Sequence, residues 1–171
     1  MLTSRKREFR MRHRVAAALL CATALTLAVT AASMARPGDI APKAVAFVNA
    51  PTQPSEQRAT AMAVERFVEA MSSHDADAIW MFASEEEQDA FGTESATYEA
   101  YAETFPEFTK ANEITFTRFW QEGDADFVQV LAGDASGAAN VATMGFWLDD
   151  AGDWKLVSCD VTPLSDLLAG L

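Results

Sequence analysis

The spacing of apolar residues changes once along this chain, and that change limits its fold more than any other feature. From Ser55 to Ser73 apolar side chains recur at helical spacing, in the stripe Ala59, Ala63, Phe67, Ala70 and Met71. From Glu113 onward apolar and polar residues alternate, which is the period of a β-strand. Helices first and strands afterwards predict an α+β domain, with the helices packed on one face of a curved sheet.

Capping residues divide the first half into four expected helices. Asp75 is placed to cap the second, and Ser84 with Glu87 forms a capping box that opens the third, which stops at Gly92. The fourth ends at Pro106, since proline lacks the N–H that a helix interior needs. The expected spans are 55–73, 76–83, the segment from the Ser84 cap to Gly92, and about 94–104.

The second half predicts about four strands in hairpin order. The alternating segments are EITFTRFWQEG, DFVQVLAG, AANVATMGFWLDD and DWKLVSCDVTP. The polar or glycine-rich turns EGDAD, GDASG and DDAGD separate them. Short connections join antiparallel neighbours, so we expect an antiparallel sheet.

Residues 1–35 have the pattern of an export signal. A basic segment that begins at Met1 or at Met11 precedes an uncharged run over residues 15–32. Small residues then allow cleavage after Ala35 or, alternatively, after Ala32. An uncleaved membrane anchor is the other interpretation of the run. The boundary favours cleavage, so we expect a secreted or periplasmic bacterial protein that is off the membrane afterwards.

Residues 36–54 contain four prolines and predict a tether, in which AVAFV can dock onto the domain. Residues 55–171 then form a single domain. After cleavage the chain keeps 7 basic and 24 acidic residues, a net charge of −17. Such an acidic protein repels phosphates, so the charge argues against nucleic acid and anionic membranes as partners.

The segment SSHDADAIWMFASEEEQDAFG raises the question of a metal site. His74 is the only histidine after residue 35, so a multi-histidine centre cannot be built around it. Helix capping by Asp75 and Ser84 explains the polar residues, and we expect no metal and no cofactor. Cys159 lies mid-strand, where a cysteine is most often a small core residue.

An ordered set of residues resembles an exported bacterial family known as domain of unknown function 4864. It comprises Phe82-Ala83-Ser84, Gln88, Phe91-Gly92, Phe105-Pro106 and WKLVSC from Trp154 to Cys159. The resemblance covers about Ser55 to Val161 and departs from the family at Ser158, where glycine is usual. It implies a cystatin-like cone fold of the nuclear transport factor 2-like superfamily and supplies no catalytic residues.

Two functions remain open from the sequence. The first is a non-enzymatic domain that binds a small ligand or another protein, and the residues expected to line its ligand pocket are Trp80, Tyr101, Phe116 and Arg118. The alternative is a small isomerase or cyclase, which would need Asp126 or Asp160 to face that pocket. The lack of a reactive set favours the first, and we assign no catalytic residue.

The strands are apolar on both sides. Alternation places Ile114, Phe116, Arg118 and Trp120 on one face of the first strand, where Arg118 either lies at the sheet margin or contacts a carboxylate ligand. Because helices cover only one face of a sheet, the other needs a cover. We expect a homodimer through the sheet, with the C-terminal tail PLSDLLAGL or the AVAFV segment as alternative covers.

Overall fold

A computed structural model describes residues 44–51 and 55–169 of the chain. All of these belong to one compact unit, Asp39–Leu171. The expected signal at 1–35, residues 36–43 and 52–54 of the tether, and residues 170–171 lie outside the described residues. The described elements are β1 (Ala46–Val48), α1 (Glu56–Ser73), α2 (Ala76–Phe82), α3 (Glu85–Phe91), α4 (Glu94–Thr104), α5 (Pro106–Lys110), β2 (Ala111–Glu122), β3 (Ala125–Asp134), β4 (Ala139–Leu148), β5 (Trp154–Pro163) and α6 (Leu164–Ala169).

Side-chain caps set the ends of the first helices, as predicted. Asp75 accepts a hydrogen bond from the backbone N–H of Ala78 at 3.0 Å and so starts α2. Ser84 and Glu87 exchange bonds in a complete capping box that starts α3. Gly92, with φ of 75°, ends α3 in the left-handed conformation, which glycine adopts without steric cost.

Proline at the end of α4 has a role that the sequence argument missed. Pro106 does stop α4, but it also occupies the first turn of a further helix, α5. A helix tolerates proline there because that N–H has no partner within the helix. A sixth helix, α6, follows β5 within the predicted C-terminal tail.

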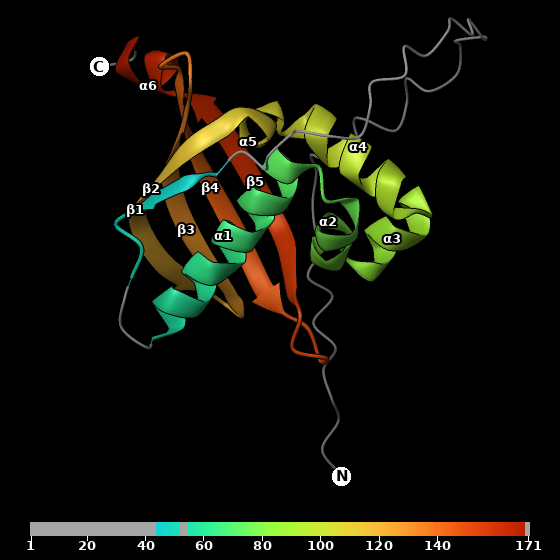
Figure 1. Ribbon diagram of the computed structural model, residues 1–171. Helices are drawn as coiled ribbons and strands as arrows, with labels where there is room; N and C mark the ends of the chain where they lie inside the picture. Colours follow the sequence, from blue (N-terminus) through green and yellow to red (C-terminus); the bar gives the residue numbers. More distant parts are fainter. Residues whose placement is uncertain (1–43, 52–54, 170–171) are drawn as a thin grey trace, which may run out of the picture. The chain divides into compact units, whose positions relative to one another are not determined.

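The sheet has five strands in the order β1-β2-β3-β4-β5, and it is mixed (Figure 1). Our expectation of about four antiparallel strands is correct for β2 to β5, which form hairpins. The added strand, β1, comes from the predicted tether and pairs in parallel with β2. Tertiary pairing, rather than local pattern, makes this three-residue segment a strand.

The core lies between the sheet and helices on one side of it. Helix α1 lies across the sheet in Figure 1, and α2 and α5 also contact strands, while α3 and α4 pack onto other helices. Phe67 on α1 lies at the centre of this core, and the centroid of its ring is 5.4 to 6.4 Å from the centroids of four other aromatic rings. Those rings belong to Phe82, Tyr101, Phe108 and Phe146.

Two β-bulges change which side chains face the helices. In β2, Phe116 pairs with Val130 and Arg118 with Gln129, so Thr117 is an extra residue. Beyond it Phe119 faces the core, while Arg118 and Trp120 point to the other side. Our prediction that Ile114, Phe116, Arg118 and Trp120 share one face is therefore wrong, because a bulge reverses the alternation.

The second bulge lies in β5. Leu156 pairs with Phe146 and Cys159 with Met144, and these partners on β4 are both fully buried. Leu156 and Cys159 thus share the helix-facing side, whereas strict alternation had put them on opposite sides. The bulge at Val157 accounts for the difference.

Candidate functional site

The side of the sheet that faces away from the core forms a continuous surface, here called the outer face. Strand register defines it, since its residues alternate with the buried ones on β3 and β4. Only Gly145 among its residues is buried; the side chains of the others are half-buried or exposed. The outer face consists of Glu113, Thr115, Arg118, Trp120, Glu122, Ala125, Phe127, Gln129, Leu131, Gly133, Ala139, Val141, Thr143, Gly145, Trp147, Ser158, Asp160 and Thr162.

Aromatic rings dominate one end of the outer face. Trp120 and Phe127 stack across β2 and β3 with centroids 5.4 Å apart and ring planes at 14°. The Arg118 guanidinium lies 5.1 Å from the centroid of the Trp120 ring, within the range of a cation–π contact. Trp147 on β4 is 41% exposed. Exposed aromatic side chains of this kind are enriched where proteins bind one another.

The Phe127 ring holds its place over Gly145. A Cβ atom at Gly145 would lie 2.7 Å from Cε1 of Phe127 and 2.7 Å from Oγ of Ser158. Gly145 keeps an ordinary negative φ, so close approach rather than backbone conformation explains the glycine. The missing side chain leaves room for the Phe127 ring beside Gly145.

A polar row crosses the centre of the outer face. Register places Arg118 beside Gln129, Gln129 beside Thr143, and Thr143 beside Asp160. Thr117, the bulged residue, donates its hydroxyl to the Gln129 carbonyl oxygen at 2.9 Å. The row therefore carries a cation at β2 and an anion at β5, about 14 Å apart across three strand spacings.

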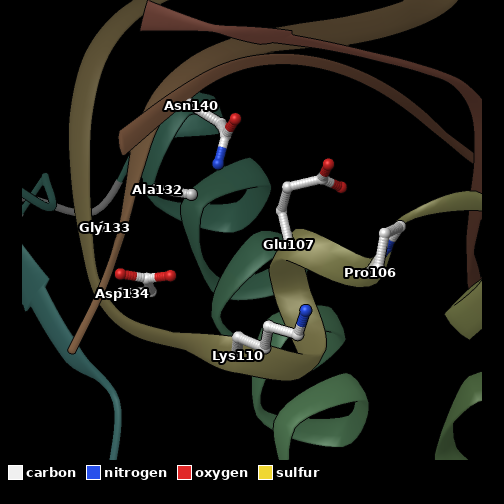
Figure 2. A pocket seen from close by; sticks show the side chains of 7 residues that line it. All are labelled: Pro106, Glu107, Lys110, Ala132, Gly133, Asp134 and Asn140. Carbon is white, nitrogen blue, oxygen red and sulfur yellow. The ribbon is translucent and has the colours of Figure 1, made fainter. Parts of the chain in front are cut away.

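A recess of about 180 Å³ opens between α5 and the ends of β3 and β4 (Figure 2). Its lining is Pro106, Glu107, Lys110, Ala132, Gly133, Asp134 and Asn140. Oδ1 of Asp134 accepts bonds from the backbone of Ser136 and Ala138, so this carboxylate stabilises the β3–β4 turn. The volume is below the range of typical small-molecule sites, about 300–1,000 Å³.

A second recess of about 120 Å³ lies at the start of α1, beside the β2–β3 hairpin. Asp126 lines it and accepts a hydrogen bond from the Thr60 hydroxyl at 3.2 Å. The other carboxylate of the enzyme alternative, Asp160, is exposed on the outer face. The two carboxylates are therefore on opposite sides of the sheet, and of the two only Asp126 lines one of the recesses described here.

The four residues predicted to line a ligand pocket do not meet. Phe116 and Tyr101 are 4% and 5% exposed in the core, and the Tyr101 hydroxyl donates to Oε2 of Glu87 at 3.3 Å. Trp80 is half-buried on α2, and Arg118 lies on the outer face. Neither recess described above contains any of the four.

Cys159 and His74 occupy structural positions. Cys159 is half-buried against the core, and burial raises the pKa of its thiol above the ordinary value. His74 is exposed and ends α1 with φ of 62°. In residues 44–51 and 55–169, no three side chains of His, Cys, Asp or Glu come together as a metal would require.

Sequence reasoning expected both sheet faces to be largely apolar, whereas the outer face also carries Thr115, Ser158, Thr162 and the polar row. The row forms only because the extra residue at Thr117 moves Arg118 to the outer face. A bulge has no reliable local signature in a run such as EITFTRFWQE. Gly145 was the available signal, since glycine within a strand often marks close approach by another group.

A protein-family model described as a domain of unknown function, DUF4864, matches residues 53–167. The chain belongs to this family. The match begins just before α1 and ends within α6, so the DUF4864 domain comprises all the helices together with β2 to β5. Neither a curated protein nor a solved structure matches the chain.

The DUF4864 match confirms the family that the sequence motifs indicated. Two residues of those motifs make hydrogen bonds that join one element to another. Gln88 donates to the Trp80 carbonyl oxygen at 2.8 Å and so joins α3 to α2. Lys155, in WKLVSC, donates to the Met81 carbonyl oxygen at 2.9 Å and ties β5 to α2. No helix in the described part of the domain is long and apolar enough to span a membrane.

Proposed function

We propose that this DUF4864 domain is an exported, non-enzymatic interaction module that binds a protein through its outer face. The observation that carries the proposal is the stack of the half-buried Trp120 and Phe127 rings, with Arg118 beside it and the exposed Trp147 nearby. Large aromatic side chains and arginine contribute most of the binding energy at protein interfaces. Trp147 leaves apolar area in contact with water, and a bound partner would cover it.

The packing of the core supports a protein partner over a small ligand. Phe67 and the four rings around it fill the space between α1 and the sheet, where a cone-shaped fold would hold a ligand. Phe67, Phe108 and Phe146 are fully buried. The recesses at the two ends of the sheet are small and partly polar. We therefore assign binding to the surface of the domain.

The distribution of charge also supports the outer face as the binding surface. At the centre of the outer face the charges of Arg118 and Asp160 cancel, and its other charged residues, Glu113 and Glu122, lie near the two ends of β2. Helix α3 alone carries four acidic residues in seven. The centre of the outer face can therefore approach a partner with less repulsion than the helices would cause.

Two finer proposals accompany this one. Helices followed by a four-strand meander support the nuclear transport factor 2-like cone suggested by the sequence resemblance. The pattern of residues 1–35 supports export to the periplasm or beyond. The intact mass of the protein recovered from the cell envelope tests export: a mass without residues 1–35 supports it, and a mass that retains them contradicts it.

Photo-crosslinking in the cells that make the protein tests the interaction. A photoreactive amino acid at Thr143, at the centre of the outer face, should yield crosslinked protein adducts. The matched control carries the same group at Arg66, which is exposed on α1. Equal adducts from both positions, or none from Thr143, would contradict the proposal. Native mass spectrometry of the same protein should show no retained small molecule; a stoichiometric one would favour the ligand-binding alternative.

A further inference from the structure

A recess beside the outer face has the chemistry of a site for a cation. It lies between the first turn of α1 and the β2–β3 hairpin, has a volume of about 120 Å³ and is here called the hairpin recess. Its lining includes Glu56 and Gln57 of α1 together with Gln121 and Asp126 of the hairpin. We propose that the hairpin recess receives an arginine or lysine side chain of the protein that binds the outer face. The inference rests on the proposed function and deepens it, because it gives the partner a chemical character.

The carboxylate of Asp126 can accept further hydrogen bonds. The Thr60 hydroxyl lies 3.2 Å from Oδ2 of Asp126 and 3.1 Å from the backbone oxygen of Glu56. A hydroxyl has one proton to donate, so these two acceptors share it, whereas an ionised carboxylate can accept about four hydrogen bonds. Thr60 is 2% exposed and Asp126 is half-buried, so packing holds both side chains in place at the recess. A guanidinium or ammonium group would supply the further donors as charge-assisted hydrogen bonds.

The described part of the chain supplies no basic side chain to the lining of the hairpin recess. Arg58, which follows Gln57 on α1, pairs with Glu65 at 3.0 Å instead. The Arg118 guanidinium lies over the Trp120 ring on the outer face. A cation that arrives from another molecule therefore meets no competing cation among the described residues that line the recess.

The charge of the domain favours a cation at this position. Residues 55–169 carry a net charge of −18, which attracts a basic partner over a long range. The N-terminus of α1 opposes a cation with about half a positive charge. Ser55 already caps that end by accepting from the backbone N–H of Arg58 at 3.2 Å. The carboxylates of Glu56 and Asp126 together outweigh the remaining partial charge.

Size and position favour the side chain of a bound protein over a metal ion or a metabolite. The recess is smaller than typical small-molecule sites, which are about 300–1,000 Å³, and the described residues contain no group of three metal-ligating side chains. Phe119 lines the recess and stacks on Phe116 with centroids 5.7 Å apart, so it offers an apolar wall to a methylene stem. Trp120 and Phe127 belong both to this lining and to the outer face. A protein that covers the outer face can therefore reach the recess.

Titration of the chain as isolated from cells with a blocked arginine tests the recess by itself. Nα-acetyl-arginine amide carries one positive charge, and Nα-acetyl-citrulline amide is its neutral counterpart of similar shape. NMR shifts of the Thr60 and Asp126 amides should give the arginine compound a dissociation constant at least about tenfold lower than that of the citrulline compound. Equal binding of the two compounds would overturn the proposal, and this comparison needs no variant of the protein.

Asp126→Asn removes the charge but keeps an acceptor for Thr60, and it should raise the dissociation constant of the arginine compound at least about fivefold. Asp124→Asn is the matched control, because it makes the same charge change at an exposed residue of the hairpin turn and should alter the constant less than about twofold. Circular dichroism should show both variants folded. Equal effects of the two variants would mean that overall charge alone attracts the cation, and would overturn the proposal.

Crosslinking in cells tests whether the cation comes from a bound protein. With the photoreactive group at Thr143, protein adducts should fall at least about fivefold in the Asp126→Asn variant relative to Asp124→Asn. Adducts that are unaffected by Asp126→Asn would overturn this inference and leave the interaction module intact. The absence of all adducts would contradict the interaction module and the protein source of the cation together, whatever the titration shows. An organic amine that stays bound in native mass spectrometry would assign the recess to a free cation instead.

Discussion

Single residues decide what each side of the sheet presents. Thr117 has no pairing partner on β3, and this extra residue in β2 places Arg118 on the outer face instead of the helix-facing side. Gly145 lacks the side chain that would displace the Phe127 ring. Tyr101 places its hydroxyl on Glu87 within the core, and burial is the main reason that the pKa of this phenol is raised. Each effect depends on a neighbour from a distant part of the chain.

Gly145→Ala should destabilise the domain and disturb the aromatic stack. The new methyl group would lie 2.7 Å from the Phe127 ring and from Oγ of Ser158, so the ring must move. We expect a loss of about 1–2 kcal/mol in the free energy of unfolding, measured with urea, together with a change in tryptophan fluorescence. Gly133→Ala is the control, since its nearest neighbours would be 4.0 Å away. Equal losses for the two variants would contradict the prediction.

Cys159 should resist alkylation in the folded protein. Burial raises the pKa of the thiol, with a further contribution from the Asp160 carboxylate, so less of the reactive thiolate is present at a given pH. Iodoacetamide at about pH 8 should modify Cys159 far more slowly than in urea-unfolded protein, as followed by peptide mass. The same measurement identifies Cys159 separately from Cys21. A folded-state rate equal to the unfolded one would show that the thiol is accessible.

At the scale of whole elements, β1 shows how a segment with weak local signals joins a sheet. Its three residues pair with Glu113, Ile114 and Thr115 on β2. Phe47 packs against the core from this position, whereas Val48 is 38% exposed. The parallel pairing requires a crossover, and α1 to α5 with their connections supply it. Docking of β1 thus extends the sheet beyond the family match, which begins at residue 53.

Phe47→Ala should weaken the domain by detaching β1. The substitution removes an aromatic ring that packs on the core, and we expect a loss of about 2 kcal/mol in the free energy of unfolding. Val48→Ala is the matched control on the neighbouring residue and should cost far less, since that side chain is partly exposed. Hydrogen exchange of β2 amides should accelerate in the first variant only. Similar behaviour of the two variants would mean that β1 adds no stability.

For the molecule as a whole, charge opposes compactness. Residues 55–169 contain 23 acidic and 5 basic residues, a net charge of −18. The ion pairs of the described part include Arg58 with Glu65 at 3.0 Å and Lys155 with Asp149 at 3.7 Å, and five basic residues can pair with only a minority of the acidic ones. Most acidic side chains therefore repel one another across the helical side and the turns. Dissolved salt screens that repulsion and so increases the stability of the folded state.

Raising the salt concentration should therefore stabilise the domain. Between about 10 mM and about 0.5 M NaCl we expect the midpoint of thermal unfolding to rise by at least about 3 °C. A neutral osmolyte such as sorbitol, added at equal osmolality, separates screening from preferential exclusion at the protein surface and serves as the control. A midpoint that falls with added salt would show that attractive pairs outweigh the repulsion.

The sequence by itself determined helices α1 to α4, the strands β2 to β5 and the family. The spacing of apolar residues, the caps at Asp75 and Ser84, and the turn residues are local signals, and local hydrogen bonding obeys them. Only the tertiary structure decided the rest. The fifth strand, the bulge at Thr117 and the position of Arg118 opposite Gln129 depend on how distant strands pair. One extra residue in a strand reverses every later side chain, so the surface proposed for binding could not be assigned until the register was known.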